Sequence, residues 1–588
     1  MKGILKKIGV CALAGLLGVG ALTAAGCSDK YGNMTTITVH YFNGGLGDDW
    51  INESIAEFEE MFKDVSFESG KMGVHVSLTS NKEFNELPTT IATGAENYDL
   101  IYTSEANVTD LLNTPGILYD TTEIVTEKMY DENGELKLNA AGDGFEIQEN
   151  GYSMYDRMHP YYQDAYNLAG TDWATGNGEV SFSLLPYEDT LAGIIIDYDL
   201  YEELCNKYRI ADKMTGYKFE GDDVAMPGTW NEFFTLLTNI RDRESHSAGG
   251  YSGFMYSVDY YTPSIEYAVI ADVDGTDEGV TDPSQYSGIR MYDTYSGQYD
   301  FEGNGTKTKI TGENSYLLTQ TRGYEAMVNV ALRLFEHGSQ GGEHYDNGIM
   351  NNPTYSTAQA NYVMSKTSQT APRILAILEG DWWENEARAT FNSMGAINEE
   401  NGYGKRTFRM MPIPHYDADS EGSYKVGGFS SGYPLILNAK TLSGNAAKEK
   451  VAKLWVQFTH SDSQMNVFTK WSGSVRPYIY DITEETKNEM TPFAKSVLEI
   501  QMEDRKEDGK IEIVRRNQIT RTNEVLLSTS PVNFMTKIDG TTFGNGAVIA
   551  NMVTMRKSNL SWTGDKQISD MLEKYMQGLL DYRNVSLN

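Results

Sequence analysis

Cysteine is the scarcest informative residue in this 588-residue chain, which contains only Cys11, Cys27 and Cys205. Cys11 lies inside an N-terminal apolar run, and no two cysteines have the C-x-x-C spacing of a metal or redox site. We therefore predict neither an intramolecular disulfide nor a cysteine-ligated metal. Cys205 follows Leu204 on a predicted helix, where a small buried core residue is expected.

Histidine and basic residues are also few. The eight histidines form no H-E-x-x-H motif, so a zinc hydrolase is not indicated. Asp131, Asn133 and Glu135 lack the full spacing of a calcium loop and are better explained as a turn. Because 83 acidic residues outnumber 48 lysines and arginines, the net charge is −35, which repels nucleic acid and anionic lipid. We expect no nucleic-acid partner, no metal and no cofactor.

Only one long apolar run occurs, Ile8–Leu22, and it is too short to span a bilayer. It follows three lysines and precedes small residues that end at Cys27, which is the pattern of a signal peptide. The segment resembles a bacterial lipoprotein box, although Ala24 stands where leucine is more common. The resemblance implies cleavage before Cys27 and lipidation of its sulfur, with an ordinary secretory signal as the alternative. We expect residues 1–26 to be the signal, residues 27–35 a tether, and the protein to lie outside a bacterial, Gram-positive-type cytoplasmic membrane.

Aromatic residues, by contrast, are abundant, with 38 tyrosines and 8 tryptophans. Most of them are expected in the core and in loops. Tyr and Trp side chains are flat and amphipathic, so any that remain on the surface suit polar ligands that have apolar faces.

The segment Ser181–Glu203 organises the rest of the chain. It begins with a predicted strand, Ser181–Leu185, whose pairing we expect Pro186-Tyr187 to end. Leu191–Ile196 is a continuous apolar run, typical of a strand buried on both faces, and Asp197 can cap the helix that follows. We interpret this segment as the place where the chain leaves one α/β lobe and enters another. A ligand between the lobes would then lie beside Tyr187, Glu188 and Asp189.

Upstream of this crossing, strands and helices alternate, which predicts a parallel sheet with right-handed crossovers. The predicted elements are the strands Thr36–Phe42, Gly73–Thr79 and Tyr98–Tyr102 and the helices Trp50–Lys63 and Glu83–Thr93. Ligands of open α/β sheets bind at the carboxyl ends of the strands. The candidate ligand-binding residues at these ends are Asn43, Asp48, Trp50, Ser80, Asn81, Lys82, Ser104 and Glu105.

Glycines follow the first predicted strand as Gly44-Gly45-x-Gly47. The loop has neither the lysine of a P-loop nor the dinucleotide-binding fingerprint. It can let backbone and Asp48 approach a ligand, or it can be a tight turn.

The same alternation resumes beyond the crossing, so the predicted fold class is α/β with two lobes. Thr229 and Glu232 form a predicted capping box there. Gly427–Leu437 and Trp471–Pro477 are predicted to cross between the lobes again, and three crossings allow hinging but not separation. The predicted domains are residues 36–188 and 428–475 for lobe 1, with an insertion at about 126–179, and residues 189–427 and 476–588 for lobe 2.

Several motifs occur in the order found in one known family. They are Ile37–Phe42 with its glycine loop, Leu185-Pro186-Tyr187, Pro227-x-Thr229-Trp230, Gly380-Asp381-Trp382-Trp383, Met411-Pro412-x-Pro414, Gly427-Gly428 and Arg476-Pro477. The chain resembles the family 1 extracellular solute-binding lipoproteins of carbohydrate ABC importers, which include maltose-binding-type proteins. The resemblance covers about residues 36–582, apart from insertions.

The resemblance implies a two-lobe class II periplasmic-binding-protein fold that captures a sugar, commonly an oligosaccharide, and delivers it to a membrane permease. It implies a monomer without enzymatic activity. Further candidate ligand-binding residues are Tyr256, Asp259, Tyr260, Tyr261, Asp381, Trp382, Trp383, Gly428 and Arg476.

Adjacent tryptophans point in different directions in both a strand and a helix, so only one of Trp382 and Trp383 is expected to line the cleft. By resemblance, this segment supplies a platform on which a sugar ring stacks. The candidate cleft loops carry many acids and few cations, which favours a neutral sugar over a sugar phosphate. These acids are Asp48, Glu105, Glu188, Asp189, Glu379 and Asp381.

Two other classes of function compete with transport. The segment Gly428–Gly432 matches G-x-S-x-G, but a nucleophile elbow opens a helix, whereas Tyr433–Leu437 is expected to be extended. Paired carboxylates of a secreted glycan-active hydrolase are a further alternative among so many acids. A surface glycan-binding lipoprotein without a transport role would bind similar ligands without hinge closure.

Overall fold

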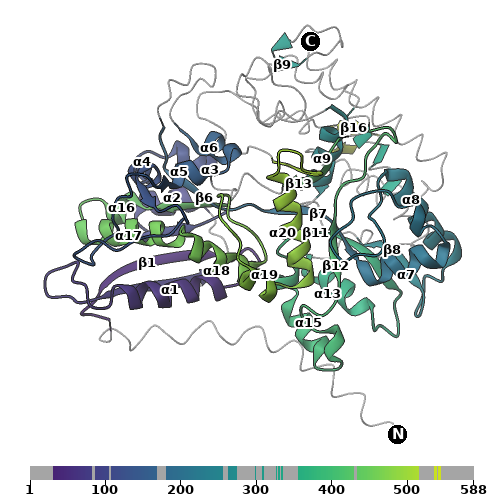
Figure 1. Ribbon diagram of the computed structural model, residues 1–588, viewed down its shortest axis with the longest axis horizontal. Coiled ribbons are helices and arrows are strands. Elements are labelled where there is room, and N and C mark those ends of the chain that lie inside the picture. The colour runs from purple at the N-terminus through teal and green to yellow at the C-terminus, as the bar shows by residue number, and fades with distance from the viewer. Residues whose placement is uncertain are drawn as a thin grey trace.

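Two mixed β-sheets, each covered by helices, form the two lobes of this computed structural model (Figure 1). The structure describes residues 31–81, 86–104, 108–168, 180–255, 262–274, 355–420, 422–428 and 433–515, together with short pieces between 298 and 334 and between 536 and 543. The first sheet has the order β2-β1-β3-β14-β6, and the second has the order β15-β13-β7-β11-β8 with β12 beside β7. The architecture is the two-lobe class II periplasmic-binding-protein fold.

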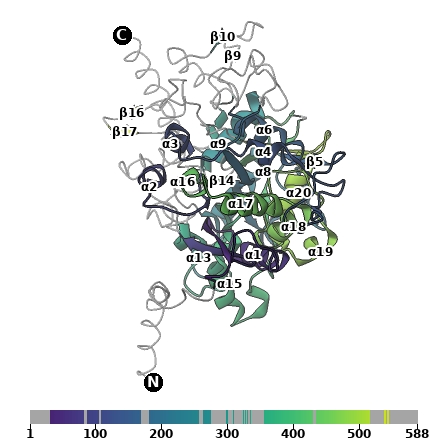
Figure 2. The ribbon, with the colours of Figure 1, turned by 90° about the vertical axis from the view of Figure 1, so that its left-hand side faces the viewer.

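Lobe 1 is built around three parallel strands, as predicted. β1 (Thr35–Phe42) pairs with β2 (Val74–Asn81) on one side and with β3 (Leu100–Tyr102) on the other. The helices α1 (Asp49–Met61) and α2 (Leu87–Thr93) connect these strands. Much later segments complete the lobe: β14 (Tyr433–Leu437), α16 (Ala439–Leu442), α17 (Ala446–Thr459) and α18 (Asp462–Ser472). Viewed from the lobe 1 end, α1 and α17 lie side by side (Figure 2).

The strand β6 (Leu184–Glu188) corrects one prediction, because it continues through Pro186 and Tyr187 instead of ending there. Among the described strands, β6 lies at the edge of its sheet beside β14. Pro186 lies opposite Pro434, whose carbonyl bonds to Thr103 on the β3 side, so the missing N–H of Pro186 would face the open edge and no ladder bond is lost. A register shift between Tyr433 and Pro434 absorbs the irregularity.

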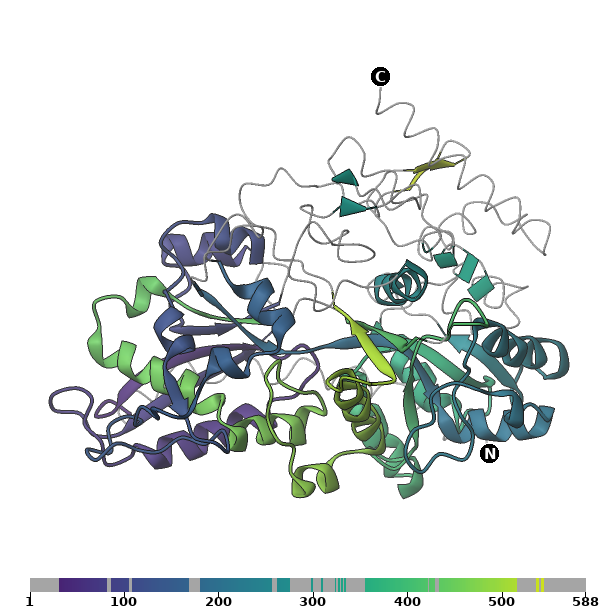
Figure 3. The same cartoon turned by 45° about the horizontal axis from the view of Figure 1, so that its top comes forward.

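Lobe 2 is centred on β7 (Leu191–Asp197), all of whose residues are buried, as its apolar sequence predicts. Figure 3 shows the chain passing from lobe 1 into this strand. The neighbouring strands are β8 (Tyr251–Met255), β11 (Arg373–Gly380), β12 (Phe408–Met411), β13 (Tyr424–Gly428) and β15 (Ile511–Val514). The helices are α7 (Tyr198–Tyr208), α8 (Trp230–Arg243), α9 (Thr262–Asp274), α13 (Tyr355–Ser365), α14 (Trp383–Glu386), α15 (Arg388–Gly395), α19 (Glu484–Glu489) and α20 (Pro492–Asp504).

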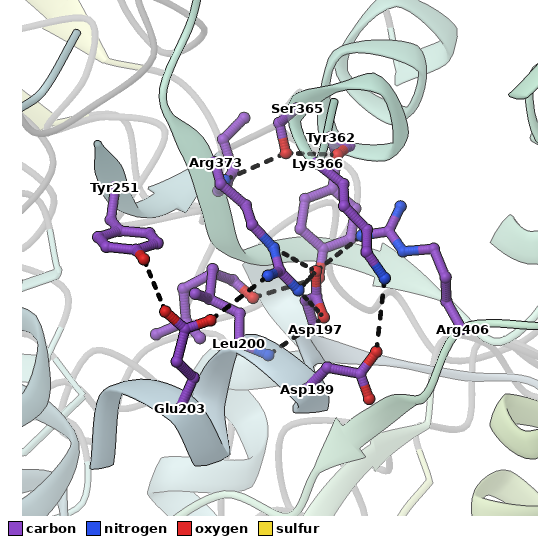
Figure 4. Close-up of polar contacts among 12 residues, drawn as sticks. Asp197, Asp199, Leu200, Glu203, Tyr251, Tyr362, Ser365, Lys366, Arg373 and Arg406 are labelled. Atoms are coloured by element: carbon purple, nitrogen blue, oxygen red, sulfur yellow. Dashed lines mark hydrogen bonds and ion pairs between the residues drawn. The ribbon is translucent and has the colours of Figure 1, made fainter. Parts of the chain in front are cut away.

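Asp197 anchors the outer end of β7. Its carboxylate accepts the N–H of Leu200 as the predicted helix cap, at 3.4 Å. It also accepts hydrogen bonds from Arg373, at 2.9 Å, and from Arg406, at 2.7 Å (Figure 4). The carboxylate is fully buried, yet the two guanidinium groups hold the pKa of Asp197 below its ordinary value. The cluster therefore fixes the start of α7 to β11 and to the segment before β12.

The start of α8 shows half of the predicted capping box. The Thr229 hydroxyl accepts the N–H of Glu232 at 3.3 Å, as expected. The Glu232 carboxylate instead accepts the N–H of Gly228 at 2.7 Å and the hydroxyl of Thr215 at 2.7 Å. Because the Glu232 carboxylate is bonded to Thr215 and Gly228, it does not accept the N–H of Thr229, and the second hydrogen bond of the capping box is absent.

The predicted insertion contains β4 (Lys128–Tyr130), β5 (Tyr152–Ser153), α5 (Met154–Arg157) and α6 (Pro160–Tyr166). Asp131 accepts the N–H groups of Asn133 and Glu135, at 2.8 and 2.9 Å, which is the predicted turn. Cys205 is fully buried, as expected. Within the described ranges, no helix is long and apolar enough to cross a membrane.

Candidate functional site

The chain crosses between the two sheets at three places that lie close together. The first joins β6 to β7 through Asp189 and Thr190, and the second joins β13 to β14. The third follows α18 through residues 473–477. The first and third crossings are tied to each other, because Asp189 donates its N–H to the carbonyl of Val475 and Arg476 donates to the carbonyl of Tyr187, at 3.2 and 2.9 Å.

The loop after β1 brings three predicted residues together at the carboxyl ends of β1 and β2. The Asn43 side-chain oxygen accepts the N–H groups of Gly45 and Gly47, at 3.2 and 3.0 Å. The Asn43 amide donates to Asp48, whose carboxylate also accepts the hydroxyl of Ser80 at 2.8 Å. The three glycines of this loop have positive φ angles, so the tight-turn interpretation describes their backbone.

This loop reaches across the lobe boundary to the segment after β11. A Cβ atom on Gly45 would lie 2.7 Å from the Trp382 ring and 2.6 Å from the Glu386 side chain, so only glycine fits here. Trp382 is 3% exposed. Glu386 accepts a hydrogen bond from Gln359 of α13 at 2.7 Å, and burial raises its pKa to about 6. An aromatic ring and an acid of lobe 2 thus face the glycine loop of lobe 1.

The two adjacent tryptophans separate as expected from the helical geometry. Trp383 is fully buried in lobe 2 and packs edge-on against Phe408 and Phe493, with ring centroids 5.0 and 5.8 Å apart. Trp382 lies instead at the boundary with Gly45. The sequence pattern could not say which of the two would be at the boundary.

Asp189 is held by side chains from both lobes. Tyr162 of α6 donates to its carboxylate at 2.6 Å, and Arg515, which follows β15, donates at 2.8 and 3.2 Å. Arg515 also contacts Asp504 of α20, at 2.7 Å. Despite complete burial, the positive charge of Arg515 and these hydrogen bonds hold the pKa of Asp189 below its ordinary value. The contacts make Asp189 part of the hinge, and its predicted contact with a ligand stays a prediction.

Asp381, at the start of the segment after β11, has a different environment. It is 5% exposed, and Ser474 of the third crossing donates to one carboxylate oxygen at 3.1 Å. The other oxygen has no hydrogen-bond partner among the residues that the structure describes. Burial raises the pKa of Asp381 to about 8.

Arg476 of the third crossing packs with Trp50 and Tyr187 of lobe 1 in one fully buried group. The Arg476 guanidinium lies 4.8 Å from the Trp50 ring centre and 4.3 Å from that of Phe468. Burial lowers the pKa of Arg476. None of these three side chains is accessible to a ligand in this arrangement of the lobes.

The other predicted site residues fall into two groups. Ser104, Glu188 and Gly428 are buried near the boundary, where the hydroxyl of Ser264 donates to the Gly428 carbonyl at 3.4 Å. Outside the described residues lie Cys27, Lys82, Glu105, Tyr256, Asp259, Tyr260 and Tyr261, together with the side chain of Asn81.

Sequence reasoning missed four residues of this region. Glu386 and Tyr433 contact the glycine loop, and Tyr162 and Arg515 hold Asp189. The position of Glu386, one helical turn after Trp382, could have indicated that the two share a face. The pairing of Arg515 with Asp189 spans 326 residues, and no local pattern indicates it.

Groups of three or more residues suited to a metal do not occur in the part of the chain that the structure describes. After Gly428, the extended strand β14 stands where a nucleophile elbow would begin a helix.

Neither a protein-family model nor a curated protein sequence matches this chain. Among solved structures, RafE in complex with raffinose is 14% identical, with a TM-score of 0.46 over 94% of this chain and 100% of its own. The apo form of RafE from Streptococcus pneumoniae is 13% identical, with a TM-score of 0.45 over 93% and 98%. The cyclic alpha-maltosyl-1,6-maltose binding protein from Arthrobacter globiformis is 11% identical, with a TM-score of 0.44 over 94% and 99%. Similarities this low specify neither a ligand nor a function for this chain.

Proposed function

We propose that this protein is an extracellular solute-binding protein that captures a neutral oligosaccharide between its two lobes and delivers it to an ABC permease. The observation that carries the proposal is the meeting of the Gly45 loop with Trp382 and Glu386 across a boundary joined by three crossings. Such a boundary can open and close as a hinge, and opening would expose an aromatic ring beside acids.

The chemistry of the boundary supports a carbohydrate ligand. A pyranose presents a C–H face that packs on an indole and hydroxyl groups that donate to carboxylates. Trp382 supplies the indole, and Glu386 and Asp48 supply carboxylates. Among the described residues, Arg476 is covered by aromatic rings and Arg515 is paired with Asp189 and Asp504, so neither offers a phosphate site.

Delivery to a permease requires the protein to remain at the membrane. The sequence before residue 31 supplies the proposed anchor, a lipid on Cys27 at the outer face of the cytoplasmic membrane. Because one acyl chain holds only marginally, we expect at least two chains. Mass spectrometry of the protein from its host tests this, and an unmodified Cys27 or a mature chain that begins elsewhere would contradict it.

A panel of neutral oligosaccharides and their phosphorylated forms, followed by calorimetry, tests the ligand class. We expect Trp382→Ala to abolish binding of the best oligosaccharide with only a small change in melting temperature. Trp383→Ala is the matched variant: we expect it to destabilise the fold by about 3–5 kcal/mol, because it empties a packed core site. If both variants bind with native affinity, the stacking platform lies elsewhere.

Small-angle scattering separates a transport protein from a surface glycan-binding protein. We expect the radius of gyration to fall when the oligosaccharide binds, because the lobes close. Binding without any change in dimensions would argue against a transport role.

A further inference from the structure

A polar cavity lies at the lobe boundary, on a different face of helix α14 from the Gly45 contact. Its volume is about 170 Å³. A water molecule needs about 10–15 Å³ of such volume, so the cavity has room for on the order of ten waters or for one small organic molecule. Its lining comes from both lobes, from Lys470, Trp471 and Ser472 at the end of α18 and from Glu384, Asn385 and Tyr403 of lobe 2.

Helical geometry explains why the cavity and the Gly45 contact are different places. Trp382 and Glu386 are one turn apart and share the face that meets Gly45. Glu384 and Arg388 are also one turn apart and, with Asn385, line the cavity. At about 100° per residue, these two faces point in clearly different directions.

Two buried acids among the lining residues have incomplete hydrogen bonding. Glu384 is 4% exposed and accepts the Thr491 hydroxyl at 2.5 Å through one oxygen, and Asp381 accepts that of Ser474. The second oxygen of each carboxyl group is buried and makes no hydrogen bond of ordinary geometry with the described residues, although the Gly404 backbone lies near Glu384 and the Leu191 backbone near Asp381. A buried polar atom without a partner costs about 1–3 kcal/mol, so a hydroxyl-bearing ligand would remove a real penalty.

The cations of the lining are already neutralised. Lys470 is paired with Glu53 of α1 at 2.8 Å, and Arg388 is paired with Asp49 at 3.0 Å. Each cation also lies over an aromatic ring of the lining, Lys470 over Trp471 and Arg388 over Tyr403, at 4.9 and 4.8 Å. An anion would therefore have to displace an existing carboxylate, and a second cation would be repelled.

From the volume, the incomplete acids and the paired cations, we infer that this cavity is a second binding site, for a small neutral polyol no larger than one sugar ring. Hydroxyl groups can donate to or accept from a carboxyl group in either protonation state. Because α18 of lobe 1 and α14 of lobe 2 both line the cavity, its ligand would favour the closed lobes. Only this coupling depends on the proposed function; the site itself does not.

Calorimetry with erythritol and with D-glucose, on the whole secreted chain, tests the inference. We expect one saturable site for at least one of these probes, with affinity reduced at least tenfold in Trp471→Ala and in Glu384→Gln. Glutamine has the shape of glutamate and keeps an oxygen that accepts the Thr491 hydroxyl, so Glu384→Gln should fold normally. A loss of probe binding in this variant would therefore not be caused by misfolding. Trp382→Ala is the control and should leave this binding unchanged while it abolishes oligosaccharide binding.

The possible failures are distinguishable. No saturable binding of either probe, or unchanged binding in both cavity variants, would overturn the second site and leave the proposed oligosaccharide function intact. Loss of probe binding in Trp382→Ala alone would also overturn it, because the probes would then occupy the cleft.

Discussion

The interlobe boundary has a buried aspartate on each side, and the pKa values of the two are shifted in opposite directions. Asp189 on the hinge side receives hydrogen bonds from Tyr162 and Arg515, and its pKa is lowered. Asp381 on the cavity side receives the Ser474 hydroxyl and lies beside the Leu191 backbone, neither of them charged, and burial raises its pKa to about 8. Both side chains are almost completely removed from water.

The difference shows that burial alone does not set the state of an acid. A paired guanidinium outweighs the cost of desolvation at Asp189, whereas neutral hydrogen-bond donors do not outweigh it at Asp381. The hinge side is therefore charged and fully connected, which suits a fixed pivot. On the cavity side, the carboxyl groups of Asp381 and Glu384 have incomplete hydrogen bonding, which suits a surface that binds a ligand.

Removing Arg515, the cation of the hinge, should have the largest effect on the stability of the fold. In Arg515→Met, both Asp189 and Asp504 would stay buried without their shared partner. We expect a loss of about 3–5 kcal/mol of unfolding free energy, measured by urea denaturation at pH 7. A loss below about 1 kcal/mol would show that the hinge carboxylates are not held as charges.

The Tyr162 hydroxyl should rank next. Tyr162→Phe removes one hydrogen bond to a charged carboxylate and leaves the ring in place. We expect a loss of about 1.5–3 kcal/mol, which fades as the pH falls below about 4. The fading follows because the folded pKa of Asp189 is lowered, so its contribution is present above the unfolded pKa and is lost in acid. A pH-independent loss would contradict the charged state of Asp189.

Asp381→Asn, unlike the two hinge substitutions, should increase the stability of the protein at high pH. A raised folded pKa means that the folded protein binds a proton that the unfolded chain has released, so the stability of the parent falls as the pH rises from about 4 to about 8. We expect the variant to match the parent at pH 5 and to be more stable by at least about 1 kcal/mol at pH 8.5. Equal stability at both values would show that Asp381 is not forced to stay protonated.

The exposed ion pair between Arg388 and Asp49 should matter least for stability. It also joins the two lobes, but both side chains are about half exposed to solvent. We expect Arg388→Met to change the unfolding free energy by less than about 1 kcal/mol, and less still in 0.5 M salt. A larger change would mean that the closed contact depends on surface charge.

Much of the fold follows from local sequence patterns. The alternation in Thr36–Phe42 and the apolar run Leu191–Ile196 correctly indicated β1 and β7. The prediction that Pro186 ends the strand was wrong, because proline is tolerated in a strand at the edge of a sheet. The edge position of β6 depends on its pairing with β14, which lies far along the chain.

The site was less predictable for a similar reason. Asn43 and Asp48 follow β1 and Ser80 lies near the carboxyl end of β2, so their meeting could be predicted from topology. The partners of Asp189 could not, because Tyr162 lies in an insertion and Arg515 is brought in by the second lobe.

The insertion of β14 between β3 and β6 has a consequence for biosynthesis. β3 cannot gain its antiparallel neighbour until residues up to Leu437 have been made, and the hydrogen bond from Trp455 to Tyr102 spans 353 residues. Such non-local pairing slows folding. Slow assembly of lobe 1 would favour the export proposed above, because translocation requires an unfolded chain. Truncated chains that end before Tyr433 would expose the bare edge of β3, and we expect them to aggregate.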